Sequence, residues 1–580
     1  MTLNRPTLIA LLLASHFASA QVKVPERLIF PSPYEMEDYA EYPEDAYLPV
    51  SRESMETSPA YRISGPSFTA VQVNINQAGE NMLGDAANEP SISVSPVDPS
   101  LMVIGWRQFD QVSSNFRQAG FAYSEDAGLN WVFPGVIEPG VFRSDPVLGV
   151  DSDGTFYYNS LTAVGSEFSC DVYKSAGLGA WDVGTDAFGG DKQWMAIDRT
   201  GGETDGNIYA YWNQNFTICP GGMFTRSTDK GLSYDDCVTV PQQPVWGTLA
   251  VGPEGEVYAS GISNTGRLMV AKSSNAGNPD EALAWDFATE VNLDGLPVAF
   301  SDPNPMGLLG QVWISVDHSE GATHGNVYLL CSVGRFSTPD VLDVMFARST
   351  DGGLTWSDPV RINDDSDPAA YQWFGTMAVA PDGRIDAVWL DTRDDPGGFQ
   401  SSLYHSFSID GGLSWSANEQ LSESFDPQIG WPNQAKMGDY FDMMSDANGA
   451  HLAWAATFNG EQDVYYGFIP FDKMVSTEEP RVEEKPLFSL AQNFPNPFGG
   501  STSITYALRK KSRVILEVFN KLGQRVALLE NGERPAGEYT LAWDGRGDQG
   551  RPLPDGAYFY RLTVGERDAA TKRMVLMQGK

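Results

Sequence analysis

Ser349-Thr-Asp-Gly-Gly-Leu-Thr-Trp356 and Ser408-Ile-Asp-Gly-Gly-Leu-Ser-Trp415 are two nearly identical stretches of this chain. Two more copies of the pattern Ser-x-Asp-x-Gly-x-x-aromatic occur earlier in the sequence. The defining residues are Ser124, Asp126, Gly128 and Trp131; Ser227, Asp229, Gly231 and Tyr234; Ser349, Asp351, Gly353 and Trp356; and Ser408, Asp410, Gly412 and Trp415. Each copy lies between short apolar runs typical of strands, so the sequence predicts one hairpin unit repeated along the chain.

The pattern has a local physical reason. Serine and aspartate side chains bond to nearby backbone N–H groups and mimic a turn. Glycine supplies the backbone freedom of a tight hairpin, and the aromatic ring covers the turn while burying a large apolar area. The four stretches resemble the Asp box, also called the bacterial neuraminidase repeat. That resemblance implies turns between the two outer strands of propeller blades, away from the central pocket, so these aspartates are predicted to be structural.

A second repeat runs out of phase with these turns. It consists of an apolar strand, an Asp/Asn/Gly turn and a strand rich in Val, Tyr, Ala and Trp, and it starts seven times between residues 90 and 440. We therefore predict a seven-bladed β-propeller over residues 66–472, with six blades as the alternative. The last unit lacks a strand, and Phe68-Thr-Ala-Val-Gln-Val-Asn74 is expected to supply it and close the ring.

Charge divides the chain near residue 485. The chain has 38 basic and 76 acidic residues, of which residues 486–580 hold 14 and 9, so the rest holds 24 and 67. Such an acidic surface repels phosphates, which argues against nucleic-acid binding. It also disfavours anionic substrates unless a pocket is locally basic.

The N-terminus reads as a signal peptide over residues 1–20. Arg5 provides the positive start, Leu8 to Leu13 the apolar stretch, and Ala18-Ser19-Ala20 the small-residue cleavage site. Residues 21–65 are predicted to be an extended, partly ordered arm. No later segment is long and apolar enough for a transmembrane helix, so we expect a secreted protein or one attached to the outer-membrane surface.

After a charged linker, predicted at 473–485, residues 486–580 show short alternating strands and Gly/Asn turns that indicate a small β-sandwich. This segment resembles the C-terminal sorting domain of type IX secretion, in the version similar to the Ig-like domain of flagellar hook-capping proteins. The resemblance rests on Gln492-Asn-Phe-Pro-Asn-Pro-Phe498, Phe519-Asn-Lys-Leu-Gly-Gln524, Trp543-Asp-Gly545 and Gly556-Ala-Tyr-Phe-Tyr-Arg561. It implies the type IX secretion machinery as a partner.

The four cysteines give one candidate disulfide. Cys219 and Cys237 flank the second turn and are placed to face each other, whereas the pairing of Cys170 and Cys331 stays open. We expect no metal site, because no metal-binding pattern occurs; a ring of carboxylates would suit calcium but does not require it.

Candidate ligand-binding residues lie at the mouth of the predicted channel, just before each inner strand, where loops converge. Arg107 and Arg393 follow second strands and are expected to reach the same face. The candidates are Glu89, Arg107, Arg143, Asp145, Asp191, Trp194, Arg393, Asp439 and Tyr440. Carboxylates, arginines and aromatic rings together are typical of carbohydrate sites.

The sequence therefore predicts a propeller that recognises an extracellular glycan or glycoprotein. Two alternatives remain: a sialidase or other glycoside hydrolase of that superfamily, and a structural or adhesive surface protein. The resemblance to sialidases implies three clustered arginines and a Tyr–Glu pair, yet Tyr61-Arg-Ile-Ser64 departs from the family's arginine motif at its last position. The catalytic residues therefore cannot be assigned from the sequence.

Overall fold

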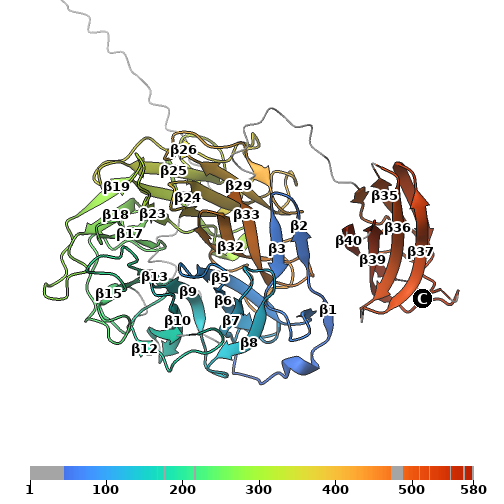
Figure 1. Ribbon diagram of the computed structural model, residues 1–580, viewed down its shortest axis with the longest axis horizontal. Coiled ribbons are helices and arrows are strands. Elements are labelled where there is room, and N and C mark those ends of the chain that lie inside the picture. The colour runs from blue at the N-terminus through green and yellow to red at the C-terminus, as the bar shows by residue number, and fades with distance from the viewer. Residues whose placement is uncertain are drawn as a thin grey trace, which may run out of the picture.

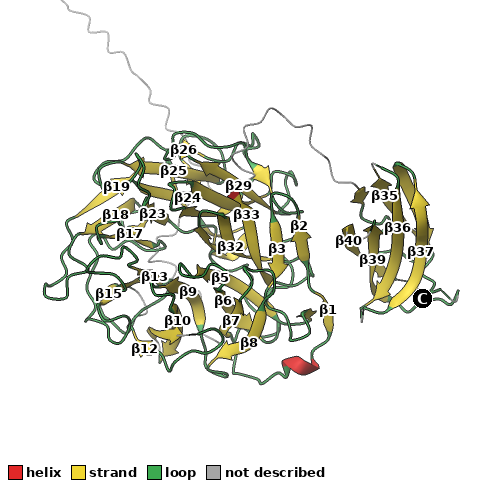
Figure 2. Ribbon diagram, in the orientation of Figure 1, coloured by secondary structure: helices red, strands yellow, loops and turns green. Residues whose placement is uncertain are grey.

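The computed structural model describes residues 45–165, 167–175, 177–214, 217–471, 488–508, 510–521, 523–548, 550–565 and 568–577. The predicted signal peptide, residues 21–44 of the predicted arm and the predicted linker lie outside these ranges. Within them the protein is all-β, apart from one 3-10 turn, η2 (Arg52–Ser54) (Figure 2). No helix in the described ranges is long and apolar enough to cross a membrane.

The described part of residues 62–470 contains seven sheets that follow one another around a ring (Figure 1). The first two sheets are β5 (Ala86–Val94), β6 (Met102–Phe109), β7 (Gln118–Ser124) and β8 (Val132–Ile137), then β9 (Ser144–Val150), β10 (Phe156–Val164), β11 (Glu167–Ser175) and β12 (Thr185–Asp186). The next two are β13 (Trp194–Ile197), β14 (Ile208–Tyr211) and β15 (Phe224–Ser227), then β16 (Leu249–Val251), β17 (Val257–Ile262), β18 (Leu268–Ser273) and β19 (Phe287–Val291).

The fifth sheet contains β23 (Trp313–Val316), β24 (Val327–Arg335), β25 (Asp343–Ser349) and β26 (Val360–Arg361), with β20 (Gly295–Pro297) on the far end of β24. The sixth contains β27 (Gln372–Val379), β28 (Ile385–Asp391), β29 (Ser402–Ser408) and β30 (Glu419–Gln420). The last contains β31 (Asp442–Ser445), β32 (Gly449–Ala456), β33 (Asp463–Pro470), β3 (Thr69–Gln72) and β2 (Arg62–Ser64). Two short antiparallel strand pairs complete the region: β1 (Thr57–Pro59) with β4 (Glu80–Met82), and the hairpin of β21 (Ala299–Ser301) with β22 (Asn304–Leu308).

The innermost strands close the ring. Each contacts the innermost strand of the next sheet, in the order β5, β9, β13, β16, β23, β27, β31 and back to β5. The all-β propeller predicted from the sequence is thereby confirmed.

The seam of the ring lies in the last sheet. Strand β3, from the N-terminal side, pairs antiparallel with β33, and Thr69 faces Phe468. Asp442 then joins the last sheet to the first: its Oδ2 accepts hydrogen bonds from the Ser91 hydroxyl at 2.6 Å and the Ile92 N–H at 3.1 Å. The last sheet also includes Arg62–Ser64, so the propeller begins earlier than the predicted boundary at residue 66.

Each of the four repeated turns follows the third strand of its sheet, and in the first, fifth and sixth sheets it leads to the fourth strand. In the third copy, the Ser349 hydroxyl donates to Asp351 Oδ1 at 2.7 Å and accepts from the Gly353 N–H at 2.9 Å. Asp351 Oδ1 also accepts from the Thr355 N–H at 2.9 Å. The same serine bonds recur in the other three copies. The local residue chemistry therefore accounts for the hairpins without reference to the rest of the fold.

Aromatic residues near these corners also connect neighbouring sheets. Trp415, in the fourth turn, packs edge-on against Phe346 of the preceding sheet, with ring centroids 5.1 Å apart. Trp131, in the first turn, lies 5.4 Å from Tyr466 of the last sheet, which precedes the first around the ring. Each such contact buries apolar area between two sheets that share no backbone hydrogen bonds.

The C-terminal region is a β-sandwich. One sheet contains β34 (Phe488–Leu490), β35 (Thr502–Leu508) and β38 (Gly537–Trp543). The other contains β37 (Arg525–Arg534), β36 (Ser512–Asn520), β39 (Gly556–Val564) and β40 (Asp568–Leu576). Ile504, Val518, Trp543 and Leu562 are among the residues of a shared core, as the predicted alternation of apolar and polar residues requires.

Candidate axial binding site

An unusual backbone conformation recurs where the inner strands begin. Five non-glycine residues there have positive φ: Glu89 (49°), Asp145 (47°), Lys192 (55°), Trp246 (58°) and Phe374 (58°). In the last sheet Gly438 (97°) occupies the corresponding place. Non-glycine residues seldom adopt this conformation, and it redirects the side chains at the strand entrance. Because these entrances surround the ring axis, residues from separate sheets meet there.

Asp439 is the centre of a buried ion network at the axis. Its Oδ2 lies 2.7 Å from Lys436 Nζ and 3.0 Å from Lys192 Nζ. Lys192 Nζ also lies 2.9 Å from Asp191 and 3.5 Å from Asp145. The network therefore unites the second, third and last sheets of the ring.

Glu89 brings the first sheet into the same network. Its carboxylate lies 3.1 Å from Arg107 Nε and 3.5 Å from Lys436 Nζ. The Arg107 Nε–H also donates to the amide oxygen of Asn88 at 2.8 Å. Four carboxylates and three cations thus meet at the axis, and the lysines of this set were absent from the sequence-based candidates.

The pKa values of the two central acids are shifted in opposite directions. The side chains of Glu89 and Asp439 are 0% and 1% exposed. Burial raises the pKa of Glu89 well above its usual range, despite Arg107 and Lys436. Burial also opposes ionisation of Asp439, but Lys192 and Lys436 together hold its pKa well below the usual range. Two carboxyl groups with opposite pKa shifts therefore lie beside the same ammonium group, that of Lys436.

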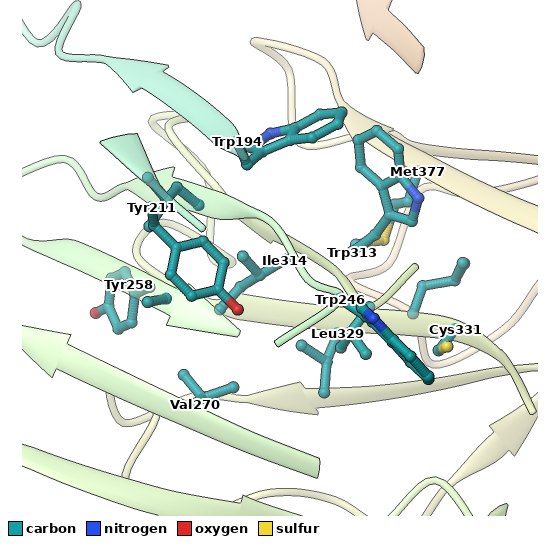
Figure 3. Packing of buried hydrophobic residues seen from close by; sticks show 14 of the residues in the cluster. Trp194, Tyr211, Trp246, Tyr258, Val270, Trp313, Ile314, Leu329, Cys331 and Met377 are labelled. Atoms are coloured by element: carbon teal, nitrogen blue, oxygen red, sulfur yellow. The ribbon is translucent and has the colours of Figure 1, made fainter. Parts of the chain in front are cut away.

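Aromatic side chains form the next layer. Trp194 packs edge-on against both Trp313 and Tyr440, with centroid distances of 5.1 and 5.4 Å. Figure 3 shows the indoles of Trp194 and Trp313 close together, with Trp246 nearby in the same core. The Tyr440 hydroxyl donates to the Pro146 carbonyl at 2.8 Å, which ties the last sheet to the second. Trp194 and Tyr440 thus lie in the same region as the ion network.

Two of the predicted arginines belong to separate networks. Arg143 bonds to Glu138 at 2.6 Å and Asp171 at 2.7 Å. Arg393 bonds to Asp391 and Asp364, each at 2.7 Å. Arg107, Arg143 and Arg393 therefore each contact a different set of carboxylates.

A Tyr–Glu contact and the arginine of the Tyr61-Arg-Ile-Ser64 motif, the other features expected from the resemblance to sialidases, belong to contacts outside the axial ion network. Tyr173 donates to Glu138 at 2.6 Å, beside Arg143, but burial and Glu138 raise the pKa of Tyr173 far above its usual range and hold it as a phenol. Arg62 is on the edge strand β2, where its guanidinium donates to the Leu129 carbonyl at 3.3 Å. The arginine of the Tyr61-Arg-Ile-Ser64 motif is therefore on the outermost strand of the last sheet rather than at the axis.

A hairpin that the sequence analysis did not anticipate covers the axis. Strands β21 and β22 lie between β20 and β23 in the connection from the fourth sheet to β23, yet they contact the segment just before β31. The Leu308 N–H donates to Asp439 Oδ1 at 2.8 Å. The proline-rich stretch Asp302-Pro-Asn-Pro305 between the fourth and fifth repeat starts was the available signal.

The sequence also makes predictions about the cysteines and about metal ions. Cys219 and Cys237 form a disulfide next to the second turn, while Cys170 and Cys331 are buried free thiols. No group of three His, Cys, Asp or Glu side chains in the described ranges is placed to hold a metal ion.

In comparisons with known proteins, the sandwich matches a protein family, and the chain is similar to solved structures at low sequence identity. Residues 495–568 match the FlgD Ig-like domain family. No curated protein matches the chain.

Three solved structures are similar at low identity. A protein of unknown function from Dyadobacter fermentans is 13% identical with a TM-score of 0.37, covering 70% of this chain and 99% of that one. A Trypanosoma rangeli sialidase with the inhibitor DANA is 10% identical with a TM-score of 0.36, covering 90% of each chain. An α-L-arabinofuranosidase from Fusarium graminearum is 11% identical with a TM-score of 0.26, covering 72% of this chain and 99% of that one.

Proposed function

We propose that this protein binds extracellular glycans at the axial site. The observation that carries the proposal is the convergence of carboxylates, ammonium groups and aromatic rings from separate sheets on one place at the ring axis. Sugar hydroxyls bond to both carboxylates and ammonium groups, and sugar faces stack on aromatic rings. Ligand sites of ring-shaped folds form where such loops converge.

The ligand class that fits best is a neutral saccharide. The axial cations are each paired with carboxylates, and Arg143 and Arg393 are engaged in the same way. A carboxylate-bearing sugar needs an arginine fork or a net positive pocket to offset its charge. The acidic remainder of the propeller adds long-range repulsion of anions.

A glycan array tests the proposal. The native full chain and the variant Asp191→Asn are each applied to neutral, sialylated and uronate-containing glycans. The Asp191 side chain is 18% exposed, which makes it the most exposed of the axial acids. Asp351→Asn, in a turn between outer strands, is the matched control. We expect binding to neutral glycans that weakens in Asp191→Asn alone. Binding restricted to sialylated glycans, or equal binding by both variants, would contradict the proposed site.

A second candidate function is hydrolysis of neutral glycosides. It is favoured by the opposite pKa shifts of Glu89 and Asp439, since glycoside hydrolysis uses one carboxyl group with a raised pKa as the acid and a second as the carboxylate. Fluorogenic neutral glycosides and a fluorogenic sialoside separate the possibilities. Turnover of a neutral glycoside that disappears in Glu89→Gln would establish an enzyme, whereas binding without turnover would support recognition alone.

Export is the remaining part of the proposal. We propose that residues 1–20 direct the chain across the inner membrane and that the sandwich acts as a type IX sorting domain. The support is the residue pattern of the N-terminus and the match of residues 495–568 to an Ig-like family. Expression in a type IX secreting bacterium, with and without residues 486–580, tests it. Equal amounts of both forms outside the cell would contradict a sorting role.

A further inference from the structure

We propose that the hairpin of β21 and β22 is a lid that must swing away for a saccharide to reach the axial acids. This inference rests on the proposed function, because it concerns access to the same site. The hairpin spans residues 299–308 and crosses from the fourth-to-fifth sheet connection to the segment before β31. It is therefore an insertion that closes the axis rather than a strand of the ring.

The base of the hairpin is anchored by apolar packing. Leu309 is buried in a hydrophobic cluster of the ring. Its N–H donates to the Val298 carbonyl at 2.8 Å, which pins the two ends of the hairpin to each other. Val298 and Leu309 would remain in place while residues 299–308 move, so these two residues provide the hinge.

The tip is held by polar contacts. The Asn304 amide N–H donates to the Gly438 carbonyl at 2.8 Å, and its oxygen accepts from the Met437 N–H at 2.8 Å. The Met306 N–H donates to the Ala435 carbonyl at 3.2 Å; Pro305 and Met306 are half-buried, whereas Asn304 is buried. These contacts with residues 435–438 are hydrogen bonds, and segments held mainly by hydrogen bonds open locally at lower free energy than an apolar core.

The lid closes directly on the central acid. Gly307 lies so near Asp439 that a Cβ added to it would meet the Gly438 carbonyl at 2.7 Å and Asp439 Oδ1 at 2.9 Å. Together with the Leu308 N–H bond, this contact keeps Asp439 almost fully buried. Opening would remove that N–H from Asp439, and a sugar hydroxyl can replace it as the donor. A ligand would thus compensate for the bond that its entry breaks.

Gly307→Ala serves as a wedge, because the added methyl group collides with the Asn304 side-chain nitrogen, the Gly438 carbonyl and Asp439. Asn304→Ala removes the latch instead. Gly202→Ala is the matched control, since a Cβ there would meet only Thr200 Oγ1, at 3.4 Å. Gly307 and Gly202 both have ordinary φ, so neither alanine is strained by the backbone.

Hydrogen exchange of the full chain in D2O provides the first readout. We expect the N–H groups of Met306, Leu308 and Met437 to exchange faster than those of β6 in the native protein, and about tenfold faster again in Gly307→Ala and Asn304→Ala. Gly202→Ala should match the native protein. Exchange of these three groups at the rate of β6 in the native protein would overturn the lid, because it would show that they open only with the whole ring.

Binding kinetics of a neutral hexasaccharide panel, made of cellohexaose, mannohexaose, xylohexaose and laminarihexaose, provide the second readout. A gating lid predicts association that is about tenfold faster in both hairpin variants than in Gly202→Ala. Faster exchange with unchanged association would overturn the gating role. Failure of every variant to bind any glycan would reject the proposed function and gating with it, while exchange still records whether the hairpin opens.

Discussion

Replacing Asp442 with asparagine should remove a large pH dependence of the propeller's stability. Asp442 connects the last sheet to the first through the Ser91 hydroxyl and the Ile92 N–H. Burial raises its pKa from 3.8 to about 7, although these hydrogen bonds and that from Met443 lower it. The folded protein therefore keeps a proton on Asp442 over a pH range in which the unfolded chain has lost it.

The sign follows from that difference. Between pH 4 and pH 7 the native state binds one more proton than the unfolded state, so the free energy of unfolding falls as the pH rises. The slope is about 1.4 kcal/mol per pH unit, and the loss is complete above pH 7 at about 4 kcal/mol in total. Asp442→Asn lacks this titrating proton, so this slope should be absent from its free energy of unfolding. The altered hydrogen bonding should shift that free energy by an amount that does not change with pH.

Urea unfolding followed by tryptophan fluorescence measures the effect. The chain has 15 tryptophans, of which only Trp543 is in the sandwich, so the signal reports mainly the propeller. The full chain, Asp442→Asn and the control Asp351→Asn are compared at half-unit steps from pH 4.5 to pH 8. Asp463, whose pKa is also raised to about 7, contributes equally to all three proteins. The reasoning is refuted if Asp442→Asn declines with pH as steeply as the other two.

Three smaller predictions concern other parts of the propeller. Lys192→Met should lower the stability by about 3–5 kcal/mol, because it leaves Asp439 and its neighbours with one cation fewer in a buried site; calorimetry showing a loss under about 1 kcal/mol would contradict the network. Ser349→Ala should lower it by about 1 kcal/mol through loss of the bond from the Gly353 N–H, and an unchanged melting temperature would count against this role of the turn. Cys219→Ser removes a disulfide between cysteines 18 positions apart and should lower the free energy of unfolding by about 3 kcal/mol relative to the oxidised native protein. Equal melting temperatures of the variant and the oxidised native protein would refute this prediction.

The repeated turns could be predicted from the sequence because their chemistry is local. Ser408, Asp410 and Gly412 make their defining bonds within five residues, so the pattern itself specifies the hairpin. Once those hairpins were placed, the apolar spacing between them was enough to indicate a ring of sheets. The closing strand at residues 69–72 followed from the strand that the last repeat lacked.

The contacts within the axial site could be predicted only in part. Lys192 and Asp439 lie in the third and last sheets, and their contact depends on how the whole ring closes. The direction of Arg143 and Arg393 depends on nearby carboxylates that no spacing rule connects to them. The covering hairpin was missed because an insertion between two repeats carries no periodic signal of where it will dock.

The pairing of β3 with β33 also constrains how the molecule reaches its native state. Thr69 and Phe468 are neighbours across this seam although almost the whole propeller separates them along the chain. Contacts between such distant segments form late, since a long loop must close before they contribute any stability. A nascent chain therefore cannot complete its circle until residue 470 is available.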